Sequence, residues 1–213
     1  MPGREIKEYY DATEHREIRS DLTLAVNLVG DYKTAIECGC GAGADIEYLL
    51  QKGFKVYGFD IEEESISRCK ERFKNNKDVI LSKSGFSSYK YPRASLVVAD
   101  ASLFFCAKTE FDYVWSNIYE CLDPNGIFCG SFLGPEDTMA GPVYDKSTFW
   151  PEISVFDEKE VRDIFKSFEI CRFTEHKTSG KTPQGILHDW HIFSVVAKKS
   201  NTSNKKMRKK CTP

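Results

Sequence analysis

The residues best suited to chemistry lie in the stretch AIECGCGAGADIEYLL, residues 35–50. Three glycines, Gly39, Gly41 and Gly43, alternate with other residues directly behind an acid, Glu37. Glycines tolerate left-handed backbone and allow a ligand to approach the main chain closely. The spacing predicts a tight turn between a strand and a helix, with room for a ligand beside it.

The same stretch holds two cysteines, which raises the question of a metal. Cys38 and Cys40 are two residues apart, whereas structural zinc sites usually use C-x2-C and need a second pair. A phosphate-binding P-loop would need Lys and then Ser or Thr behind its second glycine, and the residues after Gly43 do not fit that frame. We therefore expect neither a metal centre nor a P-loop.

A dinucleotide site is harder to dismiss, because Gly39, Gly41 and Ala44 fit G-x-G-x-x-A and Asp60 lies at the end of the next apolar run. Glu37 discriminates between the ligands. A carboxylate at that position would repel a pyrophosphate and attract a positively charged ammonium group. The residues favour a ligand that carries an ammonium group, and leave a nicotinamide-dependent oxidoreductase as the alternative.

The elements that would hold these residues alternate along the chain, which predicts an α/β fold with a parallel sheet covered by helices on both faces. Apolar spacing places helices at Ile18–Val29, from Ile46 to a stop at Gly53, and along Ile66–Phe73. Residues 157–168 are expected to form a further helix that begins with a capping box of Asp157 and Glu160. Strands are expected at residues 34–37, 55–60, 78–82, 94–100, 126–133, 169–175 and 189–199.

The segment 110–122, EFDYVWSNIYECL, is ambiguous between strand and helix. Its apolar residues step by three, one, three and four, which is a helical period. We therefore predict a helix and expect Asn117 to be a surface residue on it.

On these motifs, AIECGCGAG followed by VYGFDIEEES, the sequence resembles the class I S-adenosylmethionine (SAM)-dependent methyltransferases. The resemblance extends over residues 30–199. CLDPNGIFCGSF stands where that family has an L-x-P-G-G turn before its fifth strand, with Asn125 in place of the first glycine. Asparagine tolerates left-handed backbone, so the turn is expected to survive.

The resemblance implies a doubly wound, Rossmann-like sheet of seven strands in the order 3-2-1-4-5-7-6, with the last inserted strand antiparallel. It also implies a site. Glu37 and the turn from Gly39 to Gly43 would face the methionine part of SAM, and Asp60 would accept both ribose hydroxyls. Phe86 would flank the adenine, and Asp100 would lie near the methyl group as a cofactor contact and candidate catalytic residue, with Ser102 beside it.

Residues 1–30 are expected to form a helical cap on a single domain of residues 1–199. His15 and Arg16 on this cap could close over SAM, and Arg16 could bind its carboxylate. The loop 134–150 has the glycines, prolines and aromatic residues of a substrate-facing lid. Residues 200–213 are polar and lysine-rich, and are expected to be a disordered tail.

The function that follows is methyl transfer to a small molecule by in-line displacement, which requires mainly positioning and desolvation. The layout is similar to methyltransferases of the tellurite-resistance type. A SAM-binding protein without catalysis is a further alternative. A formal net charge of -2 does not suggest a nucleic-acid partner.

The composition also predicts the compartment and whether the chain crosses a membrane. The charged start of the sequence does not read as a signal peptide, and no run approaches the ~20 apolar residues of a membrane span. Five cysteines have apolar neighbours and are expected to be buried thiols, which indicates a cytoplasmic protein. These cysteines are Cys69, Cys106, Cys121, Cys129 and Cys171.

Overall fold

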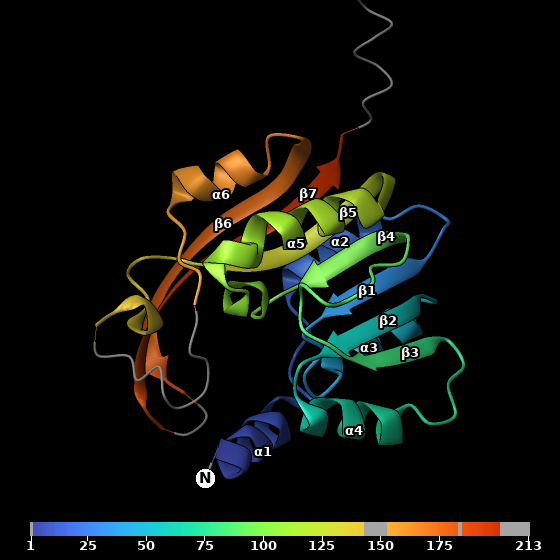
Figure 1. Ribbon diagram of the computed structural model, residues 1–213, viewed down its shortest axis with the longest axis horizontal. Coiled ribbons are helices and arrows are strands. Elements are labelled where there is room, and N and C mark those ends of the chain that lie inside the picture. The colour runs from blue at the N-terminus through green and yellow to red at the C-terminus, as the bar shows by residue number, and fades with distance from the viewer. Residues whose placement is uncertain (1, 143–152, 183–184, 201–213) are drawn as a thin grey trace, which may run out of the picture.

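The protein folds around one seven-stranded sheet (Figure 1). The computed structural model describes residues 2–142, 153–182 and 185–200, with side chains described from residue 7 onward. The strands are β1 (Thr34–Cys38), β2 (Lys55–Asp60), β3 (Val79–Lys83), β4 (Ala94–Ala99), β5 (Leu122–Leu133), β6 (Phe168–Lys181) and β7 (Leu187–Lys199). Their order in the sheet is β3-β2-β1-β4-β5-β7-β6, and β7 runs antiparallel to both of its neighbours.

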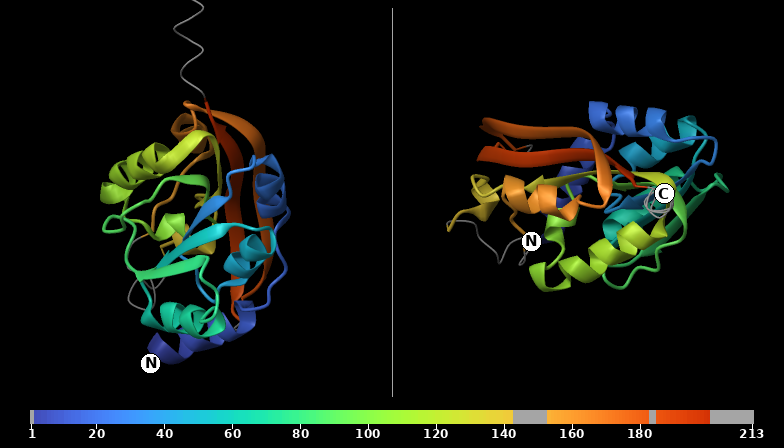
Figure 2. Two further views of the ribbon diagram at one scale, coloured as in Figure 1. Left: turned by 90° about the vertical axis from the view of Figure 1, so that its right-hand side faces the viewer. Right: turned by 90° about the horizontal axis from the view of Figure 1, so that it is seen from above.

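Helices cover both faces of this sheet (Figure 2). Buried residues of α2 (Ser20–Leu28), α3 (Ala44–Gln51) and α4 (Glu63–Arg72) pack on one face. Those of α5 (Lys108–Cys121) and α6 (Glu158–Ile164) pack on the other. The central strands are therefore buried on both sides, which explains why β4 is an unbroken apolar run apart from Ser95. Outside these layers are α1 (Pro2–Thr13) and the 3-10 turns η1 (Leu103–Phe105) and η2 (Thr138–Ala140).

The strand order and the antiparallel inserted strand predicted from the sequence are confirmed. Residues 110–121 are helical as their period indicated, Leu122 already belongs to β5, and Asn117 lies half-buried on α5. The capping box of Asp157 and Glu160 is present at the start of α6. Asn125 adopts a left-handed conformation with φ of 64°, so it replaces glycine in the turn as expected.

Two expectations about the last strands were wrong. The polar segment between residues 175 and 189 was expected to be a linker, but β6 continues to Lys181 and β7 begins at Leu187, so most of it is a long hairpin. Backbone pairing along a two-stranded arm does not need an apolar face, so the polar sequence concealed the strands. Cys171 was expected to be buried but is exposed, because the register of β6 shifts between Ile170 and Arg172 and leaves it outside the ladder.

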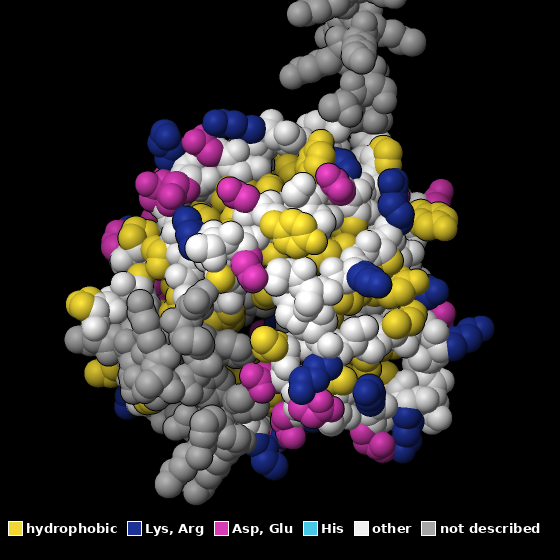
Figure 3. Space-filling model, viewed as in Figure 1, with side chains coloured by type: hydrophobic (Ala, Val, Ile, Leu, Met, Phe, Trp, Pro, Cys, Tyr) yellow, Lys and Arg dark blue, Asp and Glu magenta, His cyan; other side chains and the backbone are white. Residues whose placement is uncertain are grey.

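Parts of two other predictions lie outside the described residues. These are residues 143–150 of the expected lid and residues 201–213 of the expected tail. No described helix has both the length and the apolar composition to cross a membrane. Over the described part of the face in Figure 3, acidic and basic side chains are interspersed.

Candidate active site

Three acidic residues meet at the carboxyl edge of the sheet. Glu37 lies at the end of β1, Asp60 ends β2, and Asp100 follows β4. The strands are neighbours and parallel, so their carboxyl ends fall at one edge. The fold thus brings together acids that are up to 63 residues apart in the sequence.

The predicted glycine turn forms at this edge. Gly39, Gly41 and Gly43 have φ of 74°, 50° and 85°, which is the left-handed region that side chains with a Cβ rarely adopt. Gly39 also has no space for a side chain, because a Cβ there would come within 2.6 Å of Ser102 Cβ. The turn is held by the amides of Gly39 and Cys40, which both donate to the carbonyl of Phe59 at 2.8 and 3.0 Å.

Glu37 is a buried carboxyl with an unsatisfied oxygen. It lies on β1, which pairs with β2 and β4, the residue is 3% exposed, and Oε2 has no hydrogen-bond partner among the described residues. Burial, and then the neighbouring charge of Asp45, raises the pKa of Glu37 well above its ordinary value. A buried polar atom without a partner is costly, so such an atom points to a ligand that would satisfy it.

Asp45, in the first turn of α3, has the same property. The residue is 7% exposed, and its Oδ1 is the second buried side-chain atom that lacks a partner among the described residues. Its other oxygen accepts a hydrogen bond from Arg16 at 2.5 Å. Arg16, expected to bind a ligand carboxylate, therefore stands next to two unsatisfied acids.

Asp60 is 7% exposed and is already engaged by the backbone. Oδ2 accepts from the amide of Gly41 at 2.9 Å, and Oδ1 accepts from the amide of Glu62 at 3.0 Å. Glu62, rather than Asp60, is the N-cap residue of α4. A carboxylate has about four acceptor positions, so two remain for a diol.

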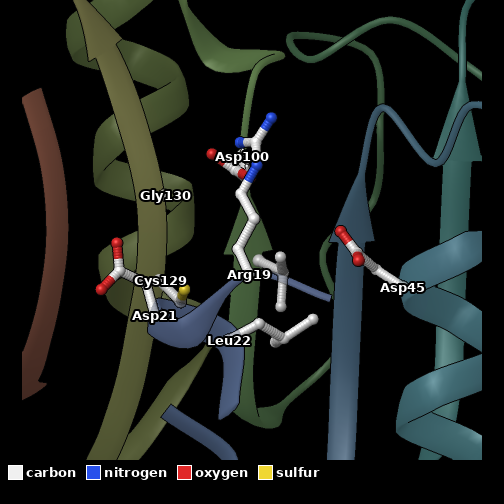
Figure 4. Close-up of a pocket in the computed structure, with 8 residues that line it drawn as sticks. Arg19, Asp21, Leu22, Asp45, Asp100, Cys129 and Gly130 are labelled. Carbon is white, nitrogen blue, oxygen red and sulfur yellow. Dashed lines mark hydrogen bonds and ion pairs between the residues drawn. The ribbon is translucent and has the colours of Figure 1, made fainter. Parts of the chain in front are cut away.

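Asp100 forms an ion pair with Arg19, the residue that precedes α2. Figure 4 shows Arg19 extending alongside β4 to Asp100, while Asp45 projects from α3 near the end of β1. These side chains line a small pocket, completed by Asp21 and Leu22 of α2, Val98 of β4, and Cys129 and Gly130 of β5. The pocket therefore lies between the predicted acid Asp100 and residues of the N-terminal cap.

The first helix, α1, closes over the glycine turn. Tyr10 is 5% exposed, and its ring lies 3.7 Å from the position that a Cβ on Gly41 would take. Arg68 of α4 donates to Asp11 at 2.8 Å and so ties α1 to α4. The N-terminal segment is therefore in contact with the edge where the acids meet.

Phe86, predicted to flank an adenine, follows β3 at the same edge. Its ring packs edge-on against Phe59, with the centroids 5.5 Å apart. Ile61, next to Asp60, is 55% exposed, and its Cδ1 lies 3.8 Å from the position of a Cβ on Gly85. An exposed apolar side chain beside Asp60 suits a flat, apolar ligand group.

The sequence reasoning missed Asp45, Arg19, Ile61 and Ser131. Asp45 could have been found, since it is an acid in the first turn of the helix behind the glycine turn. Arg19 and Ser131 carry no local signal, because their partners lie in distant strands. Among the described residues, no group of three or more His, Cys, Asp or Glu side chains is arranged to hold a metal ion.

Comparison with known proteins agrees with this geometry. Residues 35–126 match the model of a family described as a methyltransferase domain. A carboxy-S-adenosyl-L-methionine synthase of Haemophilus ducreyi is 24% identical over 161 residues, which are 71% of this chain and 66% of that protein.

Two solved structures share the fold. TehB from Haemophilus influenzae superposes with a TM-score of 0.72 at 16% identity, covering 90% of this chain and 66% of TehB. A Burkholderia thailandensis 1,6-didemethyltoxoflavin-N1-methyltransferase, solved with its substrate and S-adenosylhomocysteine (SAH), gives 0.60 at 17% identity, covering 94% and 87%. The chain thus spans just under two thirds of the length of the synthase and of TehB.

The matched segment contains the glycine turn, Asp60 and Asp100, and the sheet has the strand order that the family resemblance implies. The family model, the motifs and the fold agree. Residues 35–126 therefore match a methyltransferase domain, and the motifs, the fold and a structural neighbour solved with SAH indicate SAM as the cofactor.

Proposed function

We propose that this protein transfers the methyl group of SAM to a small molecule. One observation carries the proposal: Glu37 Oε2 and Asp45 Oδ1, the two unsatisfied buried side-chain atoms among the described residues, both lie beside the glycine turn. Arg16 donates a hydrogen bond to the second of these acids, Asp45. Two carboxylates and a guanidinium in one place suit a zwitterion, and the methionine part of SAM is one.

In this proposal the ammonium group of SAM donates to Glu37 and Asp45. The carboxylate of SAM binds Arg16, whose planar guanidinium can donate two hydrogen bonds to a carboxylate. The ribose hydroxyls use the two acceptor positions that remain on Asp60. The adenine lies between Ile61 and Phe86.

The methyl group then points toward Asp100, at the pocket that Arg19 and Gly130 line. Methyl transfer is a displacement at a sulfonium that already carries its leaving group, so the protein's task is to align the acceptor and exclude water. Asp100 is the candidate to hold the sulfonium or to accept a proton from the acceptor.

A small-molecule acceptor is favoured over nucleic acid. Acidic and basic side chains are mixed on the face shown in Figure 3, whereas a nucleic-acid enzyme needs a basic face. The Burkholderia structure is described as having 1,6-didemethyltoxoflavin and SAH bound. Residues 134–142, the described part of the predicted lid, are proposed to face the acceptor.

We also propose the organisation and the compartment. Residues 1–199 form one domain, with residues 1–30 as its cap. Six of the seven described cysteines are buried among the core side chains, which fits a reducing compartment and hence the cytoplasm.

Isothermal titration with SAH tests the cofactor, with NADH and NADPH as parallel controls. Micromolar binding of SAH alone is expected. Binding of a nicotinamide cofactor instead would show that Glu37 does not exclude a dinucleotide. Turnover of SAM in an acceptor screen then separates an enzyme from a protein that only binds SAM.

A further inference from the structure

Asp100 is followed by a residue in an unfavourable backbone conformation. Ala101 has φ of 50°, in the left-handed region, although it carries a Cβ. Such a conformation is unfavourable for a residue with a Cβ and persists only when the surroundings enforce it. It redirects the chain directly after the acid, so it determines where the Asp100 carboxylate points.

One side chain holds this conformation from the next strand. Ser131 of β5 is 1% exposed, and its hydroxyl oxygen accepts a hydrogen bond from the amide of Ala101 at 2.8 Å. Without that acceptor the amide would lose its partner in a partly buried position, which is costly. Ser131 thus satisfies the donor that the left-handed turn presents.

The end of β4 is also fixed on either side. Ser102 donates to the carbonyl of Cys38 at 2.6 Å, on the β1 side. On the β5 side, a Cβ on Gly130 would come within 2.6 Å of the carbonyl of Ala99, so the two strands touch closely there. The segment 99–102 therefore has little freedom except at the Ala101 turn.

We infer that Ser131 is a positioning residue for methyl transfer: its hydroxyl fixes the Ala101 turn and thereby aims the Asp100 carboxylate into the cofactor pocket. Ser131 itself touches neither ligand nor reacting atoms in this scheme. The inference rests on the proposed function, because it assigns Asp100 to the sulfonium of SAM.

The test is a comparison of SAM and SAH affinities by isothermal titration. Asp100→Asn is expected to weaken SAM about tenfold and SAH less, because only SAM carries a positive sulfur. Ser131→Val is expected to reproduce most of that loss. Ser131→Thr has the shape of the valine variant but keeps the hydroxyl, and is expected to stay within about threefold of the wild type.

A double substitution separates positioning from packing. If Ser131 acts through Asp100, Ser131→Val adds nothing to Asp100→Asn, since the group it aims is already changed. Ser194→Val is the matched control, because Ser194 is the cross-strand partner of Ser131 on β7. It is expected to leave both affinities unchanged.

Several results would overturn the inference. They are equal SAM affinities of Ser131→Thr and Ser131→Val, equal losses for SAM and SAH, or additive losses in the double variant. Wild-type affinity in Asp100→Asn would refute it while leaving the proposed function intact. A wild-type protein that binds neither SAM nor SAH would refute the proposed function, and the inference with it.

Discussion

Glu37 and Asp137 are equally buried acids, at 3% and 2% exposure, with opposite hydrogen bonding. Asp137, near the β6–β7 arm, accepts from the amides of Met139 and His191 at 2.9 and 3.0 Å, and its Oδ1 lies 3.0 Å from Nε2 of His188. Glu37, at the glycine turn, keeps an oxygen without a partner among the described residues. Burial alone therefore does not mark a ligand site, whereas an unsatisfied buried oxygen does.

Hydrogen bonding likewise argues against a catalytic role for the histidines of the β6–β7 arm. His191 is 3% exposed, its Nδ1 accepts from the amide of Glu136 at 3.1 Å, and its Nε2 lies 2.9 Å from Glu175. Both ring nitrogens are engaged. His191 therefore has no ring nitrogen left to act as a general base.

The largest expected effect is on stability and comes from Asp137, the buried acid whose oxygens both have hydrogen-bond partners. Asp137→Ala removes the acceptor of two backbone amides and the partner of His188, and should lower the free energy of unfolding by about 3 kcal/mol. Chemical denaturation measures this. SAH affinity of the folded fraction should be unchanged, and a selective loss of SAH binding would place Asp137 at the ligand.

Asp60 combines the two roles. It is hydrogen-bonded within the protein, where it supports the turn, and it has acceptor positions left for a ribose. Asp60→Ala should weaken SAH by about 2 kcal/mol through loss of charge-assisted hydrogen bonds. Titration calorimetry gives the affinity, and denaturation should show a smaller loss of stability. Unchanged affinity would mean that the ribose lies elsewhere.

Glu37→Gln tests the buried acid that keeps an oxygen without a partner among the described residues. The amide cannot pair with an ammonium as a carboxylate can, so SAM affinity should fall by about 1.5 kcal/mol. Stability without ligand should stay the same or rise, because a buried carboxyl without a partner is removed. Calorimetry and thermal unfolding on the same samples check both. A destabilised variant with normal affinity would reverse the assignment.

The raised pKa of Glu37 also predicts a pH dependence. An ammonium ligand favours the carboxylate, so SAM binding should release a proton, and affinity should rise as pH increases up to the raised pKa. Unliganded stability has the opposite slope. The folded state binds the extra proton, so stability is highest below the ordinary carboxyl pKa and falls as pH rises through the raised one.

Calorimetry in two buffers with different ionisation enthalpies counts the released proton. Glu37→Gln is the control and should show no release from this site. Proton uptake in the wild type would contradict the assignment.

The smallest effect should come from Glu175→Gln on the exposed part of the arm. Glu175 pairs with Lys177 and His191, but it is solvent-exposed, and such pairs contribute little. Neither the thermal midpoint nor SAH affinity should change measurably. A clear loss of SAH binding would extend the site into the arm.

Much of the fold was predictable because its signals are local. The three, one, three, four steps of residues 110–122 identified α5, and apolar runs identified the central strands. The β6–β7 arm was missed since its strands beyond the sheet bury little apolar surface. Glu37, the glycines and Asp60 were predicted from motif spacing and Asp100 from the family resemblance, and these residues do meet at one edge. Their contacts with a ligand stay a prediction.

The sequence by itself determined the glycine turn, the acids at the strand ends and the alternation that builds the sheet, because each depends on neighbours within a few residues. Only the tertiary structure decided their partners. Arg16 and Asp45 are 29 residues apart, and Arg19 and Asp100 are 81 apart. Ser131 meets Ala101 because β4 and β5 are adjacent. No local period encodes such pairs, since they arise when parallel strands bring their carboxyl ends to one edge.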